Sequence, residues 1–234
     1  MRYQRSTLMK DRLAQNRQRI LRAAREQVTR GGFRAAQIAA VATAAGLSTG
    51  SIYRYFPSKA QLFVEVLAEA VRHEVDILEA LIAAEGGASL RLRLAVESFA
   101  RRAFEGPFLA YAFIAEPAEP EVDAERLRAR RAFGEVFKTV LRQGVASGEF
   151  PAQDIDVTAA CIVGAFTEAL IGPVGLARGA TTDRDHIISS ISGFCLRAAC
   201  GTGGETSAVG RPHRRPGRQR RSVADIEPVS PLRP

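Results

Sequence analysis

Hydroxyl, aromatic and cationic side chains are concentrated in one short segment, "GLSTGSIYRYFPSK", residues 46–59. Hydroxyl groups can exchange hydrogen bonds with base edges or phosphates, while phenol and cationic groups suit phosphate oxygens. Glycine and proline punctuate the segment, which predicts that it forms an element of its own. Its chemistry suits contact with a polyanion, provided that neighbouring elements present these side chains on one face.

Two helices are predicted before this segment. Residues 12–30 carry apolar side chains at helical spacing, and Gly31 and Gly32 are expected to end that helix. A second, shorter helix is predicted over 37–45, where apolar residues repeat at intervals of three and four and define one buried stripe. Gly46 ends it and makes the turn into the polar segment.

The segment itself predicts a third short helix. Ser48 can begin it by accepting a hydrogen bond from the backbone N–H of Ser51. Pro57 ends it, because proline disfavours helical geometry in the preceding residue, and Ser58 is expected to cap a fourth helix over 59–84. Two short helices joined by a glycine turn within a three-helix unit are typical of a helix-turn-helix, whose second helix enters the major groove of DNA.

Position along the third helix predicts two roles for its polar residues. The residues expected to face base edges are Ser48, Thr49, Gly50 and Ser51. The residues expected to contact phosphates are Tyr53, Arg54 and Lys59, the last at the positive N-terminal end of the next helix.

Helical spacing places Ile52 and Phe56 on the opposite side, toward a core. Core packing is the alternative role for both tyrosines. It is expected for part of Tyr55, whereas Tyr53 falls on the face opposite Ile52 and Phe56 and is expected to reach a phosphate.

The charge balance differs among three parts of the chain. Residues 1–60 hold 12 Lys and Arg against 2 Asp and Glu, residues 61–200 hold 14 against 20, and residues 201–234 hold 7 against 3. A concentrated positive region beside a neutral-to-acidic remainder favours a polyanion-binding module joined to a separate one. A solvated arginine-rich surface is the alternative.

The segment from about 17 to 67, above all "VATAAGLSTGSIYRYFPSKAQLF" (41–63), resembles the DNA-binding domain of the tetracycline-repressor (TetR/AcrR) family of bacterial transcriptional regulators. The resemblance implies base recognition by residues 48–51 and phosphate contacts from Tyr53 and Lys59. It also implies a second-helix start near Gln37 and a phosphate contact from Gln37, at a position where family members often place a threonine that caps the helix and touches a phosphate. Glutamine is a poorer cap.

Beyond about residue 70 the resemblance implies an all-helical domain that senses a ligand and dimerises. Helices are predicted there at 89–104, 108–115, 122–147, 155–171 and 183–200, separated by glycine and proline. The fold expected for the whole chain is therefore all-α.

Four parts follow from the helix pattern and the charges. They are a basic N-terminal arm (1–11), a helix-turn-helix domain (12–58), a helical ligand-sensing and dimerisation domain (59–200) and a disordered basic tail (201–234). The tail is rich in Gly, Pro, Ser and Arg and poor in core formers. Its arginines could add nonspecific affinity for DNA, although simple solvation of the tail is favoured.

The stretch 158–172 is apolar almost all round, which predicts burial on all sides. Its small residues would let another helix approach closely, so it suits a dimer interface, although the central core helix of a monomer would look the same. The residues predicted for the interface are Ala160, Gly164, Ala165, Ile191 and Phe194.

Aromatic residues of the second domain predict an apolar pocket around the break at 106–107. Each of them could instead be ordinary core packing. The scarcity of charges expected to be buried favours a hydrophobic or aromatic effector. The residues predicted to line the pocket are His73, Phe99, Phe104, Phe108, Tyr111, Phe137 and Phe166.

Other classes of site are not supported. The three cysteines form no CxxC pair and the three histidines lie far apart, so neither a metal site nor a cofactor is predicted. No stretch reaches about eighteen uninterrupted apolar residues, and the arginine-rich N-terminus lacks the apolar core of a signal peptide. A cytoplasmic protein without a membrane partner is expected.

These observations predict a homodimer that binds a palindromic operator in double-stranded DNA, blocks transcription and is released by a small molecule. One alternative is a nucleic-acid-acting enzyme, such as a recombinase with a similar head. Its metal ligands would have to come from the acidic residues of 116–125, which are better explained by solvation and helix-dipole preference. An adaptor that binds protein is disfavoured by the basic head.

Overall fold

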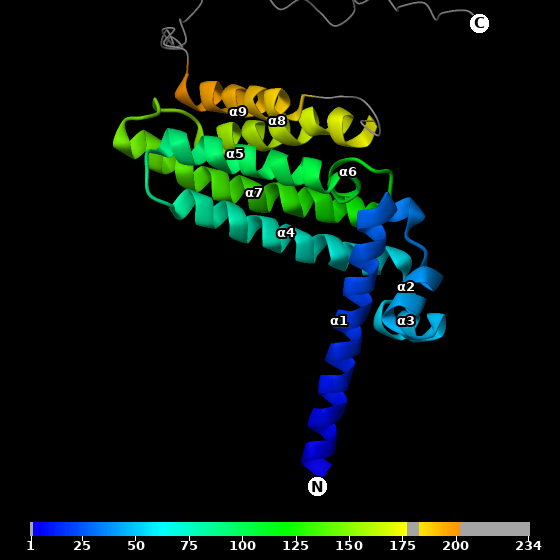
Figure 1. The fold of residues 1–234 in the computed structure, drawn as a ribbon. Coiled ribbons are helices and arrows are strands. Elements are labelled where there is room, and N and C mark those ends of the chain that lie inside the picture. Colours follow the sequence, from blue (N-terminus) through cyan, green and yellow to red (C-terminus); the bar gives the residue numbers. More distant parts are fainter. Residues whose placement is uncertain (1, 177–182, 202–234) are drawn as a thin grey trace, which may run out of the picture. The chain divides into compact units, whose positions relative to one another are not determined.

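The computed structural model describes residues 2–176 and 183–201, and within these ranges the chain is all-α, with nine helices and no strand (Figure 1). The helices are α1 (Arg2–Ala35), α2 (Ile38–Ala45), α3 (Thr49–Tyr55), α4 (Lys59–Ala83), α5 (Ala88–Glu105), α6 (Pro107–Ile114), α7 (Pro120–Ser147), α8 (Ile155–Leu176) and α9 (Arg184–Cys200). Residues 202–234 of the predicted tail lie outside the described ranges.

The first helix is longer than predicted. It begins at Arg2 and not at residue 12, because no glycine or proline interrupts the chain before residue 31. The predicted arm over 1–11 is therefore part of α1 from Arg2 onward. The helical path breaks at Gly32, whose φ of 76° and ψ of −174° are non-helical, so the predicted glycine stop is found as a kink.

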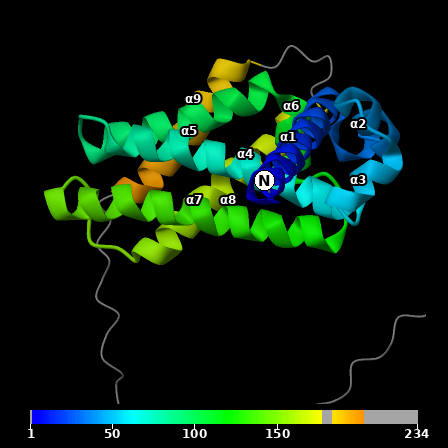
Figure 2. The same ribbon diagram turned by 90° about the horizontal axis from the view of Figure 1, so that it is seen from below.

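Apolar side chains from four helices form one core in the head of the molecule. Ile20 of α1, Val41 of α2, Ile52 of α3 and Phe63 of α4 are all buried, together with Phe56 just after α3. Figure 2 shows α1, α2 and α3 grouped at the N-terminal end of α4. The apolar stripe predicted for α2 from three- and four-residue spacing is thus buried in this core. Packing of Ile52 against the same core turns the polar face of α3 outward.

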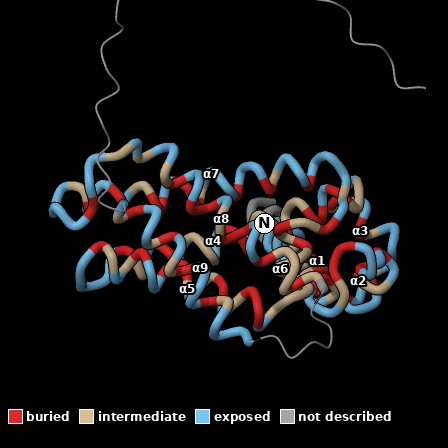
Figure 3. The backbone as a smooth tube through the Cα atoms, turned by 90° about the horizontal axis from the view of Figure 1, so that it is seen from above, coloured by how far each residue is buried: buried red, intermediate tan, exposed pale blue. Residues whose placement is uncertain are grey.

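The remaining helices form the body. The helix α7 packs against α4 and α8, α5 packs against α4 and α9, and α6 packs against α1 and α8. Buried residues lie on the sides of the helices that face one another (Figure 3). Since α4 contacts both α1 and α7, one helix contributes to both head and body. A domain division at residue 59 stays a prediction.

The N-terminus of α5 is capped from a distant part of the chain. The carboxylate of Glu149, just after α7, accepts hydrogen bonds from the backbone N–H groups of Ala88 at 2.8 Å and Ser89 at 3.0 Å. These bonds, first from Ser89 and then from Ala88, hold the pKa of Glu149 below its ordinary value. Such a cap satisfies backbone donors that a helix N-terminus leaves free.

Within this chain, 158–172 is not buried on all sides. In α8, Ile162 and Phe166 are buried, whereas Ala160 and Gly164 are exposed. The reason is that α5, α6, α7 and α9 cover only one side of the helix. By length and composition Ile155–Gly175 could also cross a membrane, a property that core helices of soluble proteins share, and the packed side of α8 accounts for its apolar character.

Candidate DNA-binding surface and ligand pocket

Local capping orients the N-terminal turn of α3. The Ser48 hydroxyl oxygen accepts from the Ser51 backbone N–H at 3.2 Å, as predicted, and lies 2.8 Å from the Ser51 hydroxyl oxygen. Thr49 and Gly50 are exposed, and the Thr49 hydroxyl makes no hydrogen bond within the described part of the chain. A Cβ atom at Gly50 would meet nothing within 4 Å. The open end of α3 is therefore presented by Thr49 and Gly50, while Ser48 and Ser51 mainly build the cap.

The two tyrosines of α3 have different surroundings. Tyr53 is 48% exposed, although it is a large aromatic residue. Tyr55 packs against the core, and its hydroxyl oxygen accepts a hydrogen bond from Asn16 Nδ2 at 3.1 Å. The expectation that Tyr55 is partly core and Tyr53 is not is confirmed. Tyr53 is consequently free to meet a partner outside the chain.

The predicted cations and Gln37 lie beside this face. Arg54 is exposed and makes no hydrogen bond or ion pair within the described part of the chain. Lys59 is half-buried at the first position of α4, with its Nζ 5.2 Å from the centre of the Phe63 ring. Gln37 does not cap α2, as its type predicts; its side-chain nitrogen donates instead to the Arg34 carbonyl oxygen at 3.0 Å.

Two arginines of α1 hold the turn region in place, and the sequence patterns did not indicate them. Arg19 Nη2 donates to the Ala45 carbonyl oxygen at 2.6 Å, directly at the turn between α2 and α3. Arg17 forms an ion pair with Glu65 of α4. These contacts bind α1 to the elements that present α3, so part of the positive charge of the head is structural.

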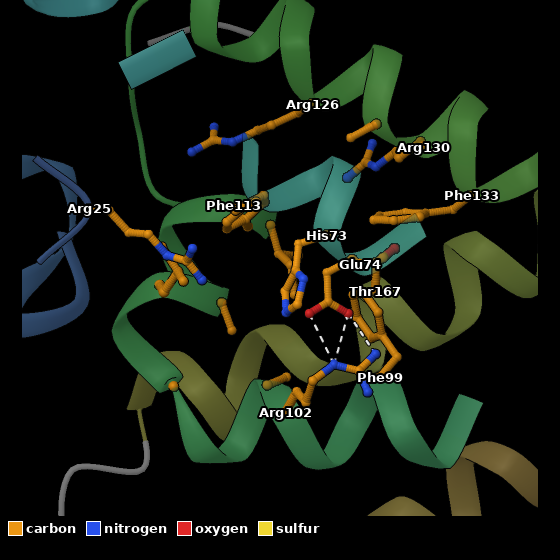
Figure 4. Close-up of a pocket in the computed structure, with 17 residues that line it drawn as sticks. Arg25, His73, Glu74, Phe99, Arg102, Phe113, Arg126, Arg130, Phe133 and Thr167 are labelled. Carbon is orange, nitrogen blue, oxygen red and sulfur yellow. Dashed lines mark hydrogen bonds and ion pairs between the residues drawn. The ribbon is translucent and has the colours of Figure 1, made fainter. Parts of the chain in front are cut away.

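A cavity of about 110 Å³ lies in the body (Figure 4). Its apolar wall includes Phe99, Phe113 and Phe133. Phe99 packs edge-on against Phe133 and lies 4.8 Å, centre to centre, from Phe166 behind it. A mostly apolar hollow with a few polar groups is typical of a small-molecule site.

Charged groups also line this cavity, although Arg126 is the one buried residue among them, as the expected scarcity of buried charges predicts. Arg102 donates from Nε to both carboxylate oxygens of Glu74 at 3.0 Å, and from Nη2 to one of them at 2.6 Å. His73, Thr167 and the arginines Arg25, Arg126 and Arg130 complete the polar lining. The sequence offered one signal for Arg126, since it lies in the buried stripe of α7 with Val122 and Phe133.

Of the residues predicted to line the pocket, His73 and Phe99 do so. Five others do not line this cavity. Phe137 and Phe166 are fully buried in the core behind it, and Tyr111 packs against α8, where a Cβ at Gly175 would lie 2.8 Å from its ring. Phe104 is buried, with its ring 5.8 Å from the Arg184 guanidinium, and Phe108 is not part of the cavity lining.

Glu116 joins the loop between α6 and α7 to the kink of α1. Its carboxylate accepts from the backbone N–H groups of Phe33 at 2.8 Å and Arg34 at 3.0 Å, and the residue is only 4% exposed. The solvated role predicted for Glu116 is therefore wrong, because two backbone donors, one buried and one partly buried, hold its charge. A contact across 83 positions leaves no local signal in the sequence.

Arg126 connects this loop to the cavity. Its Nη2 donates to the carbonyl oxygens of Ala112 at 2.6 Å and Glu116 at 2.5 Å, and its Nη1 donates to Asp123 at 2.5 Å. The Nε atom is buried and has no hydrogen-bond partner within the described residues. One side chain thus lines the cavity and also holds the backbone of Glu116. The contact of the Glu116 carboxylate with Phe33 and Arg34 is called the clasp below.

An apolar face of α8 and α9 has no neighbour within the described part of the chain. Val157 is 57% exposed and Phe194 is 54% exposed, and Gly164 has nothing within 4 Å of the position of a Cβ. Ala165 is only half-buried, whereas Ile191 is 7% exposed and packs into the chain's own core. Burial therefore removes Ile191 from the predicted interface and leaves the other four residues available.

The family comparison agrees with this architecture. Residues 20–66 match the profile described as bacterial regulatory proteins, tetR family, and residues 85–170 match the tetracyclin repressor-like C-terminal domain. The chain is 31% identical to the HTH-type transcriptional repressor KstR of Mycolicibacterium smegmatis over 147 residues, which are 60% of this chain and 67% of that one. It is 44% identical to KstR of Rhodococcus jostii over 68 residues, 27% of this chain and 32% of that repressor.

Solved structures with this fold include regulators crystallised with small molecules. The regulator FadR of Bacillus subtilis in complex with stearoyl-CoA superposes with a TM-score of 0.67 at 20% identity, covering 77% of this chain and 98% of FadR. RolR in complex with resorcinol superposes with a TM-score of 0.64 at 20% identity, covering 81% of this chain and 90% of RolR. With two family profiles matched and a repressor aligned over two thirds of its length, the chain belongs to the TetR family of bacterial regulatory proteins.

Proposed function

We propose that the protein is a homodimeric transcriptional repressor of the cytoplasm that binds a palindromic operator and is released by a small molecule with a largely apolar body. The observation that carries the proposal is the exposed N-terminal turn of α3, where Thr49 and Gly50 are unengaged and Tyr53 and Arg54 lie alongside. Small residues allow close approach to base edges, while phenol and guanidinium groups suit the flanking phosphates. The repressor role is supported by the KstR relatives.

The homodimer is supported by the face of α8 and α9 that carries Ala160, Gly164 and Phe194. Two copies of this face can meet about a two-fold axis, because a two-fold interface pairs the same patch on both subunits. Such a dimer would carry two α3 helices, and a palindromic site offers them equivalent half-sites about one helical turn apart.

Release by a ligand is supported by the continuous contacts between cavity and head. Arg126 lines the cavity and holds the Glu116 backbone, while the Glu116 side chain holds Phe33 and Arg34 just before α2. A ligand that favours another arrangement of Arg126 would therefore change the position of α2 and α3. Thermodynamic reciprocity requires that DNA then weakens ligand binding by the same factor. The small molecules bound by FadR and RolR support an organic effector with an apolar part.

Selection from a library of random DNA duplexes tests the proposal. We expect enrichment of sequences with two inverted half-sites, each duplex bound by two protomers in sedimentation analysis. Enrichment of single, unpaired half-sites would contradict the dimer, and no enrichment above the input library would contradict sequence-specific binding. The Arg142→Ala variant, altered at an exposed position of α7, should enrich the same sequences as the wild type.

A further inference from the structure

The cavity of the body has an imbalance of charge. Its lining contains one carboxylate, that of Glu74, against four guanidinium groups. Arg102 donates three hydrogen bonds to the Glu74 carboxylate, so the charges of these two residues cancel. Arg126 is paired through Asp123. The remaining two arginines, Arg25 and Arg130, give the cavity a positive excess.

Neither of these two arginines has a partner of its own. Arg25 and Arg130 make no side-chain hydrogen bond or ion pair within residues 2–176 and 183–201. They come from different helices, α1 and α7, and Figure 4 shows both side chains extending toward the cavity. Arg25 is half-buried and Arg130 is exposed, so both can meet an anion that enters from solvent, and charge-assisted hydrogen bonds favour its binding there.

The buried Nε of Arg126 is a second indication. It is a donor without an acceptor in the described structure, although it belongs to a side chain whose other nitrogens are all engaged. A buried donor without a partner is costly, and an acceptor atom from a ligand would satisfy it.

The apolar part of the lining sets the rest of the ligand. Phe99, Phe113 and Phe133 present aromatic surface, and Leu109 adds an aliphatic side chain. A volume of about 110 Å³ suits a compact group such as one aromatic ring or a short acyl chain.

We propose that the effector is an organic acid, whose apolar body packs on the phenylalanine lining and whose carboxylate is attracted by the two unpaired arginines of the cavity, Arg25 and Arg130. Guanidinium groups bind carboxylates through paired, charge-assisted hydrogen bonds. This inference rests on the proposed function and names the chemical class of its effector. Because Arg25 belongs to α1, an anionic group that approaches it meets the head as well as the body, so this group is also the part of the ligand that acts on α1.

Calorimetry on the full chain tests the class with a matched pair of probes, 4-phenylbutyrate and its neutral amide. We expect the acid to bind about tenfold tighter than the amide or more, since a charged hydrogen-bond pair contributes at least that factor. Arg25→Gln and Arg130→Gln should each weaken binding of the acid by about tenfold and leave binding of the amide unchanged. Arg22→Gln of α1 and Arg128→Gln of α7, both exposed and outside the cavity, are the matched controls.

Several results would overturn the proposal. They are equal affinity for acid and amide, unchanged affinity for the acid in both cavity variants, and no binding of the acid at concentrations up to about 1 mM. Thermal unfolding without probe establishes that each variant is folded. Selection of DNA by the wild type uses no ligand, so a negative result here and a failure of the proposed function are distinguishable.

Discussion

The carboxylate of Glu116 lies 2.8 Å from the backbone nitrogen of Phe33, although 83 positions separate the two residues in the chain. The contact depends on Gly32, because a Cβ at that position would lie 2.5 Å from a Glu116 carboxylate oxygen and the φ of Gly32 is 76°. The loop between α6 and α7 thereby holds the chain at the point where α1 gives way to α2. This clasp, the contact of Glu116 with Phe33 and Arg34, joins the body to the DNA-binding head in addition to α4.

Replacement of Glu116 by alanine should destabilise the fold. The variant leaves the backbone N–H groups of Phe33 and Arg34 without acceptors in a buried position, which costs about 2 kcal/mol or more in the free energy of unfolding. Urea unfolding at fixed protein concentration measures this. Glu119→Ala, three positions along the same loop and exposed, is the control and should change the free energy little. Equal losses in both variants would contradict the clasp.

Removal of the Lys59 charge should weaken DNA binding without changing its specificity. Lys59→Ala is expected to lower the magnitude of the slope of log K against log salt concentration by about one per protomer, because one phosphate contact per protomer is lost. Titration of a selected duplex at several salt concentrations gives the slope. The Arg142→Ala variant should keep the wild-type slope. A wild-type slope for Lys59→Ala as well would remove this residue from the DNA contacts.

A large charged side chain at Gly164 should produce a folded monomer. A Cβ atom at Gly164 has no clash with other parts of the described chain, so Gly164→Arg should fold, but its side chain would obstruct a second copy packed on α8. Sedimentation equilibrium reports the mass, and circular dichroism reports the helical content. Ala80→Arg, at an exposed position of α4, should remain a dimer. A dimeric Gly164→Arg protein would place the interface elsewhere.

The cap of α5 predicts a pH dependence. The folded-state pKa of Glu149 lies below its ordinary value of 4.5, so the ionised carboxylate stabilises the fold above that pH. This contribution is lost as the pH falls through the folded-state pKa. The difference in the free energy of unfolding between wild type and Glu149→Gln should therefore be full at neutral pH and shrink below pH 4.5. Urea unfolding across this range checks it, with exposed Glu85→Gln as control; a difference that does not change with pH would contradict the charge-dependent cap.

Features that depend on neighbours in the sequence could be predicted from it. The caps at Ser48 and Ser58 involve residues three positions apart, and both are found in the structure. The buried stripe through Ile52 and Phe56 follows in the same way from helical spacing. Short-range geometry is enough to place the polar face of α3.

The clasp and most of the cavity lining could not be predicted, because each joins distant parts of the chain, although His73 and Phe99 do line the cavity as expected. Glu116 resembles a solvated loop carboxylate in the sequence and is buried only because Phe33 and Arg34 lie against it. Likewise, Phe137 and Phe166 are aromatic residues of the kind that line pockets, but helix packing buries both of them in the core. The apolar surface of α8 predicted burial, yet only one of its sides is covered by this chain.

The central claim is that the exposed turn of α3 reads base pairs, and sequence selection with a Thr49→Ala variant tests it most directly. Thr49 is exposed and, unlike Ser48 and Ser51, takes no part in the hydroxyl cap, so its replacement should leave the helix intact. Parallel selection by wild type and variant from one random duplex library should return half-sites that differ at one or two positions, with their spacing unchanged. Recovery of the same half-sites by both proteins would contradict base reading by α3.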